Sequence, residues 1–143
     1  MKFENYMVLE FPSKSCNEAF ARSAVACFAA QLDPTLEELG DIRTAVSEAV
    51  TNCIVHAYPD EFGLITLRCR ILKDHILDIV VKDKGVGISN IEEARRPAFT
   101  TGGNDRSGMG FTIMESFMTD LEITSKPLKG TTVHMRRKLL RRK

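Results

Sequence analysis

The sequence lacks the patterns that mark metal centres, membrane spans and secreted proteins. Its four cysteines form no Cys-x-x-Cys pair and its three histidines are scattered, so the ligand spacing of a metal site is missing. No apolar run approaches the roughly 20 residues that a membrane helix needs. Charges at Lys2, Glu4 and Glu10 argue against a signal peptide. Cys27 and Cys53 lie among apolar residues and are expected to be reduced core thiols, which fits a cytoplasmic protein with no membrane partner.

An excess of charge of one sign is missing as well. The net charge is +1, and residues 136–143 hold six basic groups and no acid. Without that tail, 14 basic residues stand against 19 acidic ones, a net charge of −5. An acidic body argues against a domain that binds nucleic acid directly. The basic tail alone could touch RNA or a membrane surface, but a frayed, solvated terminus is the commoner case and is the one we expect.

Three widespread nucleotide and kinase motifs are also absent. The chain has no Gly-x-x-x-x-Gly-Lys-[Ser/Thr] segment, and Ile113 occupies the place of the third glycine of Gly-x-Gly-x-x-Gly. Neither a P-loop nor a dinucleotide-binding fold is therefore supported. No His-Arg-Asp or Asp-Phe-Gly triplet is present, which excludes an ordinary protein kinase.

The length of 143 residues suits one domain spanning 1–143, with the basic tail at about 136–143. Hydrophobic periodicity and turn residues predict, in order, a strand over 6–11, helices over about 15–32 and 35–56, strands over 64–72 and 76–82, a helix over 110–118, and strands over 121–125 and 131–135. Strands cluster rather than alternate with helices. We therefore expect an α/β (α+β) two-layer sandwich, with a mixed, mostly antiparallel sheet and helices on one face.

Two of these elements carry detailed expectations. Ser15 and Glu18 have the spacing of a capping box at the start of the first helix. The apolar spacing of that helix predicts a buried face made of Phe20, Ala24, Cys27 and Phe28. The strand over 64–72 alternates between apolar and polar residues, which predicts a half-buried strand with these residues inward: Ile65, Leu67, Cys69 and Ile71.

Glu48 and Asn52 are the first candidates for chemistry. They are four residues apart on the second helix, so they share one of its faces. The pair could be an ordinary solvent-facing contact. Asn is a poor helix former, however, and its amide oxygen suits Mg²⁺, which prefers oxygen ligands. A carboxylate one turn away could accept a proton from an attacking hydroxyl.

The second candidate is the segment 83–87, which follows an apolar strand. Asp-x-Gly is common turn chemistry, so a simple turn is one interpretation. In the other, Asp83 accepts a hydrogen bond from the amino group of a base. Gly85 and Gly87 would then let the backbone approach the ring closely.

The third candidate, Ser107-Gly108-Met109-Gly110, opens a helix after a loop. Glycine-rich backbone at a helix N-terminus offers N–H groups and a favourable dipole to phosphate. A lone Gly-x-Gly is weak evidence by itself.

The order of these features, with Gly130-Thr131 near the last strand, resembles the GHKL ATPase superfamily. That superfamily includes histidine kinases, gyrase, Hsp90 and MutL, and the resemblance implies its Bergerat ATP-binding fold. Within it, the chain is similar over about residues 5–136 to the sporulation anti-sigma F factors of spore-forming bacteria. The segments that carry this similarity are 46–52, 85–88, 91–95, 99–101 and, most specifically, 106–115. Anti-sigma B kinases of the general stress response share the ATP motifs but are less similar around 109–115.

The resemblance implies a role for each matching position. Glu48 would be the general base, and Asn52 would ligate Mg²⁺. Asp83 would contact adenine N6, with Gly85 and Gly87 near the base and Thr131 assisting through water. Phosphate contacts would come from the segment 95–109 and the helix start that follows it, through Thr100, Thr101, Arg106, Ser107, Gly108, Met109 and Gly110. The implied cofactors are ATP or ADP and Mg²⁺.

The resemblance also implies partners and an activity. Family members form homodimers, hold sigma F in an ATP-dependent complex, and act as protein serine/threonine kinases on a serine of an anti-anti-sigma factor. Arg22 matches a family position at the partner-binding surface, although a solvated helix charge explains it equally well. Two alternatives stay open: an anti-sigma kinase for a general-stress sigma factor, and an ATP-gated binding module without kinase activity. No phospho-accepting histidine motif is present, so a two-component histidine kinase is not expected.

Two departures from the family pattern stand out. The segment 101–106 is shorter and richer in glycine than the family pattern, which puts the placing of Arg106 in question. Ala57 follows His56 where a glycine is common.

Overall fold

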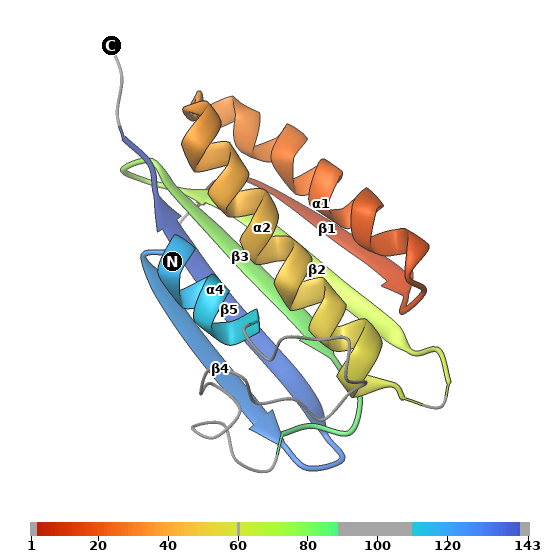
Figure 1. Ribbon diagram of the computed structural model, residues 1–143. Coiled ribbons are helices and arrows are strands. Elements are labelled where there is room, and N and C mark those ends of the chain that lie inside the picture. The colour runs from red at the N-terminus through yellow and green to blue at the C-terminus, as the bar shows by residue number, and fades with distance from the viewer. Residues whose placement is uncertain (1–2, 60, 89–109, 141–143) are drawn as a thin grey trace.

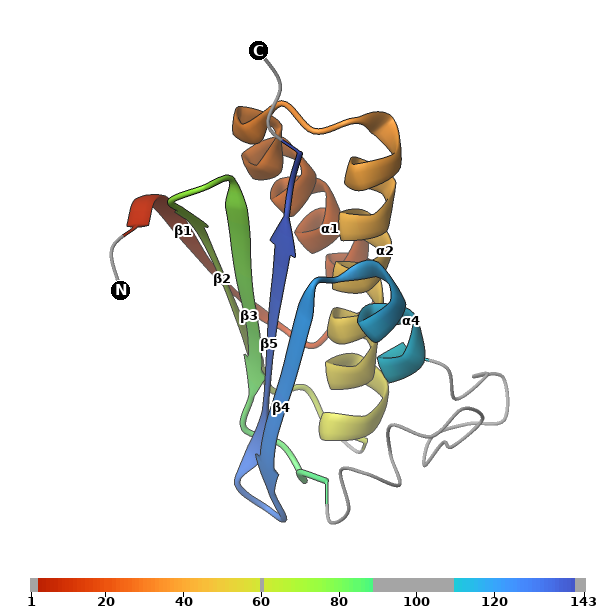
Figure 2. The same ribbon diagram turned by 90° about the vertical axis from the view of Figure 1, so that its left-hand side faces the viewer.

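Five strands form one sheet in the order β1-β2-β3-β5-β4, and every neighbouring pair is antiparallel (Figure 1). The computed structural model describes residues 3–59, 61–88 and 110–140. Along the chain run β1 (Phe3–Pro12), α1 (Cys16–Ala29), a 3-10 turn (Ala30–Leu32), α2 (Leu36–Asn52), a π-helical turn (Cys53–Ala57), β2 (Leu64–Leu72), β3 (Ile76–Asp83), α4 (Gly110–Phe117), β4 (Asp120–Lys126) and β5 (Gly130–Lys138). All three labelled helices lie on one face of the sheet (Figure 2). The predicted two-layer sandwich is confirmed.

The core fills the space between the helices and the sheet. Ile65, Leu67 and Cys69 of β2 are fully buried and Ile71 nearly so, which confirms the inward side predicted from the alternation. Side chains from all three helices meet them, chiefly Val25, Phe28, Ile42, Val46, Val50 and Met114. Burying each large apolar side chain contributes about 1.5–3 kcal/mol. This layer therefore holds α2 rigidly against the sheet.

The predicted face of α1 is wrong by one position. Ala21, Val25, Phe28 and Ala29 are buried, whereas Phe20 is 54% exposed and Cys27 is also exposed. Phe28 is the one predicted member of the face that is buried, and the rest of the buried face is made of Ala21, Val25 and Ala29. The expectation of a core thiol thus holds for Cys53 and is wrong for Cys27.

The expected capping box at Ser15 is also wrong. Ser15 has helical backbone angles and makes no side-chain cap bond. Glu18 instead pairs with Arg22 at 3.3 Å along the same helix. A full capping box occurs at α2, where Thr35 and Glu38 exchange hydrogen bonds of 3.0 and 2.9 Å.

Much of the predicted basic tail belongs to the fold. β5 continues to Lys138, and Leu139 is buried. The Arg137 guanidinium donates to Asp41 at 3.0 Å and to the carbonyl of Phe117. The backbone N–H of Leu140 donates to Glu38 at 3.0 Å. The expectation of a frayed end from residue 136 is therefore wrong for residues 136–140, which are held by β5 pairing and by the start of α2.

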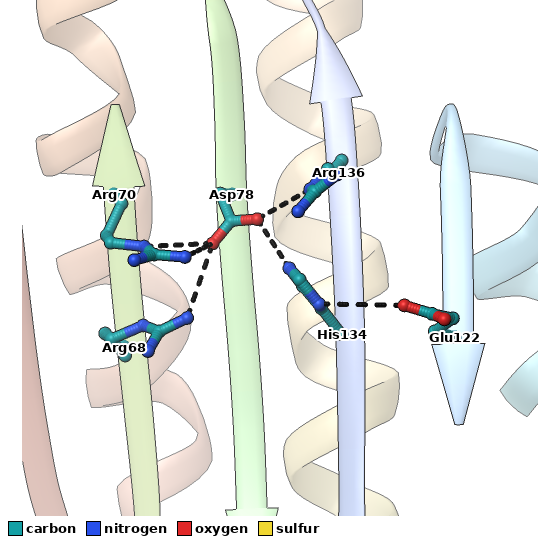
Figure 3. A network of polar contacts seen from close by, with 6 residues as sticks. All are labelled: Arg68, Arg70, Asp78, Glu122, His134 and Arg136. Carbon is teal, nitrogen blue, oxygen red and sulfur yellow. Dashed lines mark hydrogen bonds and ion pairs between the residues drawn. The ribbon is translucent and has the colours of Figure 1, made fainter. Parts of the chain in front are cut away.

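The face of the sheet away from the helices buries a carboxylate. Asp78 of β3 is 0% exposed, and the basic side chains of β2 and β5 lie over it (Figure 3). Its oxygens contact Arg68 at 3.6 Å, Arg70 at 3.3 Å, Arg136 at 2.8 Å and His134. Burial opposes ionisation of Asp78, but hydrogen bonds from His134 and Arg136 outweigh it, so the pKa of this carboxyl lies below its ordinary value. We call these five residues the Asp78 cluster.

Candidate functional site

Glu48, Asn52 and Gly110 come together where the last turns of α2 meet the start of α4. Glu48 and Asn52 are half-buried on one face of α2, as their spacing predicts. A Cβ placed on Gly110 would lie 3.1 Å from Asn52 Nδ2 and 3.3 Å from Glu48 Oε1. A side chain at this position would crowd the ends of Asn52 and Glu48, so glycine suits the close approach of the α4 backbone. The first backbone N–H groups of α4 therefore lie beside an amide and a carboxylate.

These three residues offer the groups that a phosphate with a hard cation requires. Amide and carboxylate oxygens are ligands that Mg²⁺ accepts, and the N-terminus of a helix favours anions. In the described part of the chain no group of three or more His, Cys, Asp or Glu side chains could hold a metal ion. A cation here would therefore be held by few protein oxygens and by ligand phosphates, the usual arrangement for Mg²⁺.

Asp83 is the second centre of the site, at the end of β3. It is 4% exposed, yet both carboxylate oxygens have donors. Oδ1 accepts from the backbone N–H of Gly85 at 3.0 Å and of Thr131 at 3.1 Å. Oδ2 accepts from the thiol of Cys53 at 3.3 Å. These contacts fix the orientation of the carboxylate between β3, β5 and the π-helical turn.

Gly85 and Gly87 follow Asp83 in places that exclude a side chain. A Cβ on Gly85 would lie 2.1 Å from the carbonyl oxygen of Ala57. Gly87 has φ +77°, and a Cβ there would lie 2.1 Å from the carbonyl oxygen of Lys126. Both glycines are required by the close approach of backbone segments.

The π-helical turn supports this strand end. It begins directly after Asn52, and such turns occur frequently at functional sites. The Ala57 carbonyl accepts the N–H of Val86 at 2.9 Å. The Tyr58 hydroxyl donates to the Leu64 carbonyl at 2.8 Å and accepts from the N–H of Lys84 at 2.7 Å. Alanine in place of the family's glycine at position 57 thus leaves the backbone contact intact.

Thr131 touches Asp83 through its backbone, and its side chain bonds elsewhere. Its hydroxyl shares a 2.8 Å hydrogen bond with Ser125 on β4. The Ser125 hydroxyl also contacts the Gly130 carbonyl at 2.9 Å and accepts the N–H of Ile88 at 2.8 Å. Ser125 therefore joins the β4–β5 hairpin to the segment that follows Gly87.

The structure thus groups the predicted residues into two neighbouring sets. One holds Glu48, Asn52 and Gly110, and the other holds Asp83, Gly85, Gly87 and Thr131. Cys53 connects them, because it follows Asn52 in the chain and donates to Asp83. Six predicted residues lie outside the described residues: Thr100, Thr101, Arg106, Ser107, Gly108 and Met109.

The sequence analysis did not identify Cys53, Tyr58 or Ser125 as parts of this site. Cys53 could have been found, since it directly follows Asn52 in the chain and cannot lie far from it. Tyr58 and Ser125 act on backbone groups of distant segments. No sequence pattern signals such contacts.

A separate pocket lies on the helical layer. It is lined by Arg22 of α1 and by Gly40, Arg43, Thr44 and Ser47 of α2. Two guanidinium groups and two hydroxyls give it a character suited to acidic or hydrogen-bonding partners. Ser47 immediately precedes Glu48 in the chain, so the pocket lies on a different face of α2 from the first set of site residues. Among the helices in the described residues, none is long and apolar enough to cross a membrane.

Comparison with known proteins agrees with this geometry. A family model described as the histidine kinase-like ATPase domain matches residues 11–137. The chain is 57% identical over 136 residues to the anti-sigma F factor of Caldanaerobacter subterraneus, covering 94% of both chains. It is 51% identical over 141 residues to the anti-sigma F factor of Bacillus licheniformis, covering 98% of this chain and 97% of the other.

Solved structures show the same fold at low identity. The RsbU and RsbW domains of Rv1364c from Mycobacterium tuberculosis match with a TM-score of 0.72 at 18% identity, covering 97% of this chain. The chain spans 34% of the length of that structure's chain. The histidine kinase domain of the blue-light activated kinase EL346 from Erythrobacter litoralis matches with a TM-score of 0.59 at 23% identity, covering 85% of this chain and 60% of that one.

Proposed function

The chain belongs to the anti-sigma F factors within the histidine kinase-like ATPase domain family, and on that premise we propose that it binds Mg-ATP and phosphorylates a serine of an anti-anti-sigma factor. We further propose that it sequesters sigma F in the cytoplasm as a homodimer. The single observation that supports the kinase proposal best is the meeting of Glu48, Asn52 and the start of α4 at Gly110.

The proposed chemistry assigns one task to each residue. The Asn52 amide oxygen ligates Mg²⁺, and the first N–H groups of α4 donate to phosphate oxygens. The Glu48 carboxylate accepts the proton of the serine hydroxyl as that oxygen attacks the γ-phosphorus, and the bond from the γ-phosphorus to the bridging oxygen breaks to release ADP. Bound Mg²⁺ supplies neutralisation of the phosphate charge. Since phosphoryl transfer depends mainly on positioning and charge neutralisation, this small set of groups is sufficient.

The base-binding end is proposed at Asp83. Its carboxylate accepts from the N6 amino group of adenine, while Gly85 and Gly87 keep the adjoining backbone free of side chains. Thr131 assists by holding Oδ1 of the same carboxylate. By resemblance, Thr100, Thr101, Arg106, Ser107, Gly108 and Met109 complete the contacts to the phosphates.

The protein substrate is proposed to dock over α1 and α2. The pocket lined by Arg22 and Arg43 adjoins Ser47, one residue from the proposed base. A partner seated there would bring its hydroxyl toward Glu48. Arg22 is partly exposed and pairs with Glu18 of its own helix at 3.3 Å, and we propose that an acid of the partner replaces this contact.

Glu48→Gln tests the kinase proposal. The amide keeps the shape but accepts a proton poorly, so ADP binding measured by calorimetry should stay within about twofold while transfer of labelled γ-phosphate falls by about 10²-fold or more. Glu37→Gln, at the far end of the same helix, is the matched control and should retain full transfer. Full transfer by Glu48→Gln removes Glu48 from the base role.

Two further outcomes separate the alternatives. Unmodified protein that binds ATP yet never labels the partner would be a binding module gated by ATP. A pull-down that retains a general-stress sigma factor in place of sigma F would reassign the target.

A further inference from the structure

The Cys53 thiol makes a buried contact with the residue proposed to bind adenine. Its Sγ lies 3.3 Å from Asp83 Oδ2. Cys53 and Asp83 are each 4% exposed, so water has little access to either group. The thiol belongs to the π-helical turn that begins after Asn52. It contacts the Asp83 carboxylate at the proposed base-binding end of the site.

The thiol is the donor in this contact. Burial, the negative charge of Asp83 and the hydrogen bond to it raise the pKa of Cys53 well above its ordinary value. The geometry gives the same direction, because a carboxylate oxygen can only accept and the sulfur lies 3.3 Å from Oδ2. A protonated thiol is a weak donor, and a carboxylate oxygen is a strong acceptor.

Counting the acceptor positions on Asp83 shows what remains for a ligand. Each carboxylate oxygen has two lone pairs. Oδ1 receives two backbone N–H groups, so both of its positions are used. Oδ2 receives the thiol, which leaves it one acceptor position. The direction in which this remaining lone pair of Oδ2 points depends on how the hydrogen bond from Cys53 orients the carboxylate.

We propose that Cys53 is a positioning residue that fixes the Asp83 carboxylate so that its remaining acceptor position meets the 6-amino group of a purine. The inference rests on the proposed nucleotide binding and adds a determinant of base specificity. A 6-amino purine presents a donor at this place, whereas a 6-oxo purine presents an acceptor and repels the carboxylate. An Asp83 carboxylate held in one orientation discriminates between 6-amino and 6-oxo purines, and a carboxylate that can rotate discriminates less.

A purely structural role for Cys53 makes a different prediction. A thiol that only fills space would affect both kinds of purine equally when removed. Cys69 supplies the comparison, since it is a fully buried thiol on β2 whose pKa burial raises to about 12. It lies opposite Ile79, four positions along β3 from Asp83.

The test measures ADP and IDP binding by calorimetry with Mg²⁺ for unmodified protein, Cys53→Ala, Cys53→Ser and Cys69→Ala. Cys53→Ala removes the hydrogen bond that holds Asp83 Oδ2. It should weaken ADP binding about fivefold and change IDP binding less than about twofold, because only the contact to the 6-amino group depends on the orientation of that carboxylate. Cys53→Ser keeps a donor and should stay within about threefold of the unmodified preference. Cys69→Ala should leave the ADP/IDP ratio unchanged.

Several results would overturn the assignment. An unchanged ADP/IDP ratio in Cys53→Ala, or an equal fall in Cys69→Ala, makes Cys53 a packing residue. Failure of unmodified protein to bind ADP overturns the proposed function together with this inference, which distinguishes the two failures.

A second measurement covers the case in which Cys53→Ala does not fold. The S–H stretching band of Cys53, identified in the infrared spectrum by its loss in Cys53→Ser, should shift when ADP binds to unmodified protein. IDP should shift it less. A band that ADP leaves unmoved overturns the assignment.

Discussion

On β3, Leu77, Ile79 and Val81 point toward the helices, while Asp78 between them points to the uncovered side of the sheet. All four side chains are fully buried, but by different means. The first three are covered by α1, α2 and α4, whereas Asp78 is covered by charged side chains from its own sheet. Arg and His side chains can hide a neighbour because their apolar stems lie along the surface while their polar ends reach water.

The difference shows that burial has two separate origins in this sheet. On the helical side it follows from the meeting of two layers and does not depend on ionisation. On the uncovered side of the sheet, the burial of Asp78 depends on its charge and on its pairing with the arginine and histidine side chains. The second kind of burial is therefore sensitive to mutation of a single charge and to pH.

Breaking the Asp78 cluster should have the largest effect. Asp78→Asn removes the charge that Arg70, Arg136 and His134 share. Loss of one member of a buried ion pair costs about 3 kcal/mol, at the lower end of the usual range because these guanidinium groups reach water. Urea unfolding at pH 7 measures the free energy of unfolding. Glu122→Gln, an exposed carboxylate 4.0 Å from His134, is the control and should cost less than about 0.5 kcal/mol. Equal losses of unfolding free energy in Asp78→Asn and Glu122→Gln would show that the buried carboxylate stabilises the fold no more than the exposed one.

Two neighbouring valines test the contrast between the two sides of the sheet with a smaller expected effect. Val81 is fully buried toward the helices, and Val80 is half-buried on the uncovered side. Val81→Ala should lower the free energy of unfolding by about 2 kcal/mol, and Val80→Ala by less than about 1 kcal/mol. The same urea titrations measure both. Similar losses would show that the two sides are packed alike.

The smallest expected effect is the change in unfolding free energy at acidic pH. The pKa of Asp78 is lower in the folded protein than in the unfolded chain, so its contribution is complete above the unfolded value near 3.8 and is lost as pH falls through the folded value. The difference in unfolding free energy between unmodified protein and Asp78→Asn should therefore shrink as pH falls below about 4. Glu38, whose pKa is also lowered, contributes equally to both proteins and cancels in the difference. If the difference in unfolding free energy stays constant down to pH 2, the fold does not stabilise the charged form of Asp78.

The sequence predicted the layers because strong periodicity carries that information. The alternation of Ile65, Leu67 and Cys69 with polar residues determined which side of β2 faces the helices. The face of α1 could not be predicted, since Phe20, Ala21, Ala24 and Val25 are all apolar and only close packing against α2 selects among them. The tail was misjudged for a related reason. Arg136 and Arg137 look solvated in a sequence, and only the fold supplies Asp78 and Asp41 as partners.

The site divides in the same way. Glu48, Asn52, Asp83 and the glycines follow from motif spacing, and the structure brings the described ones together as two adjoining sets. Tyr58 and Ser125 act through contacts between segments distant in the chain. Such contacts depend on strand order and have no local signature.

The strand order also governs how the chain must assemble during synthesis. β5 enters between β3 and β4, so the strand that reaches residue 138 occupies an interior place in the sheet. Until it emerges from the ribosome, β3 has an open edge and Asp83 lacks the N–H group of Thr131. A nascent chain with only β1, β2 and β3 would be a three-stranded sheet in which Asp83 lacks one of its backbone donors. If Asp83 binds the base as proposed, this end of the site is complete only after translation has passed β5.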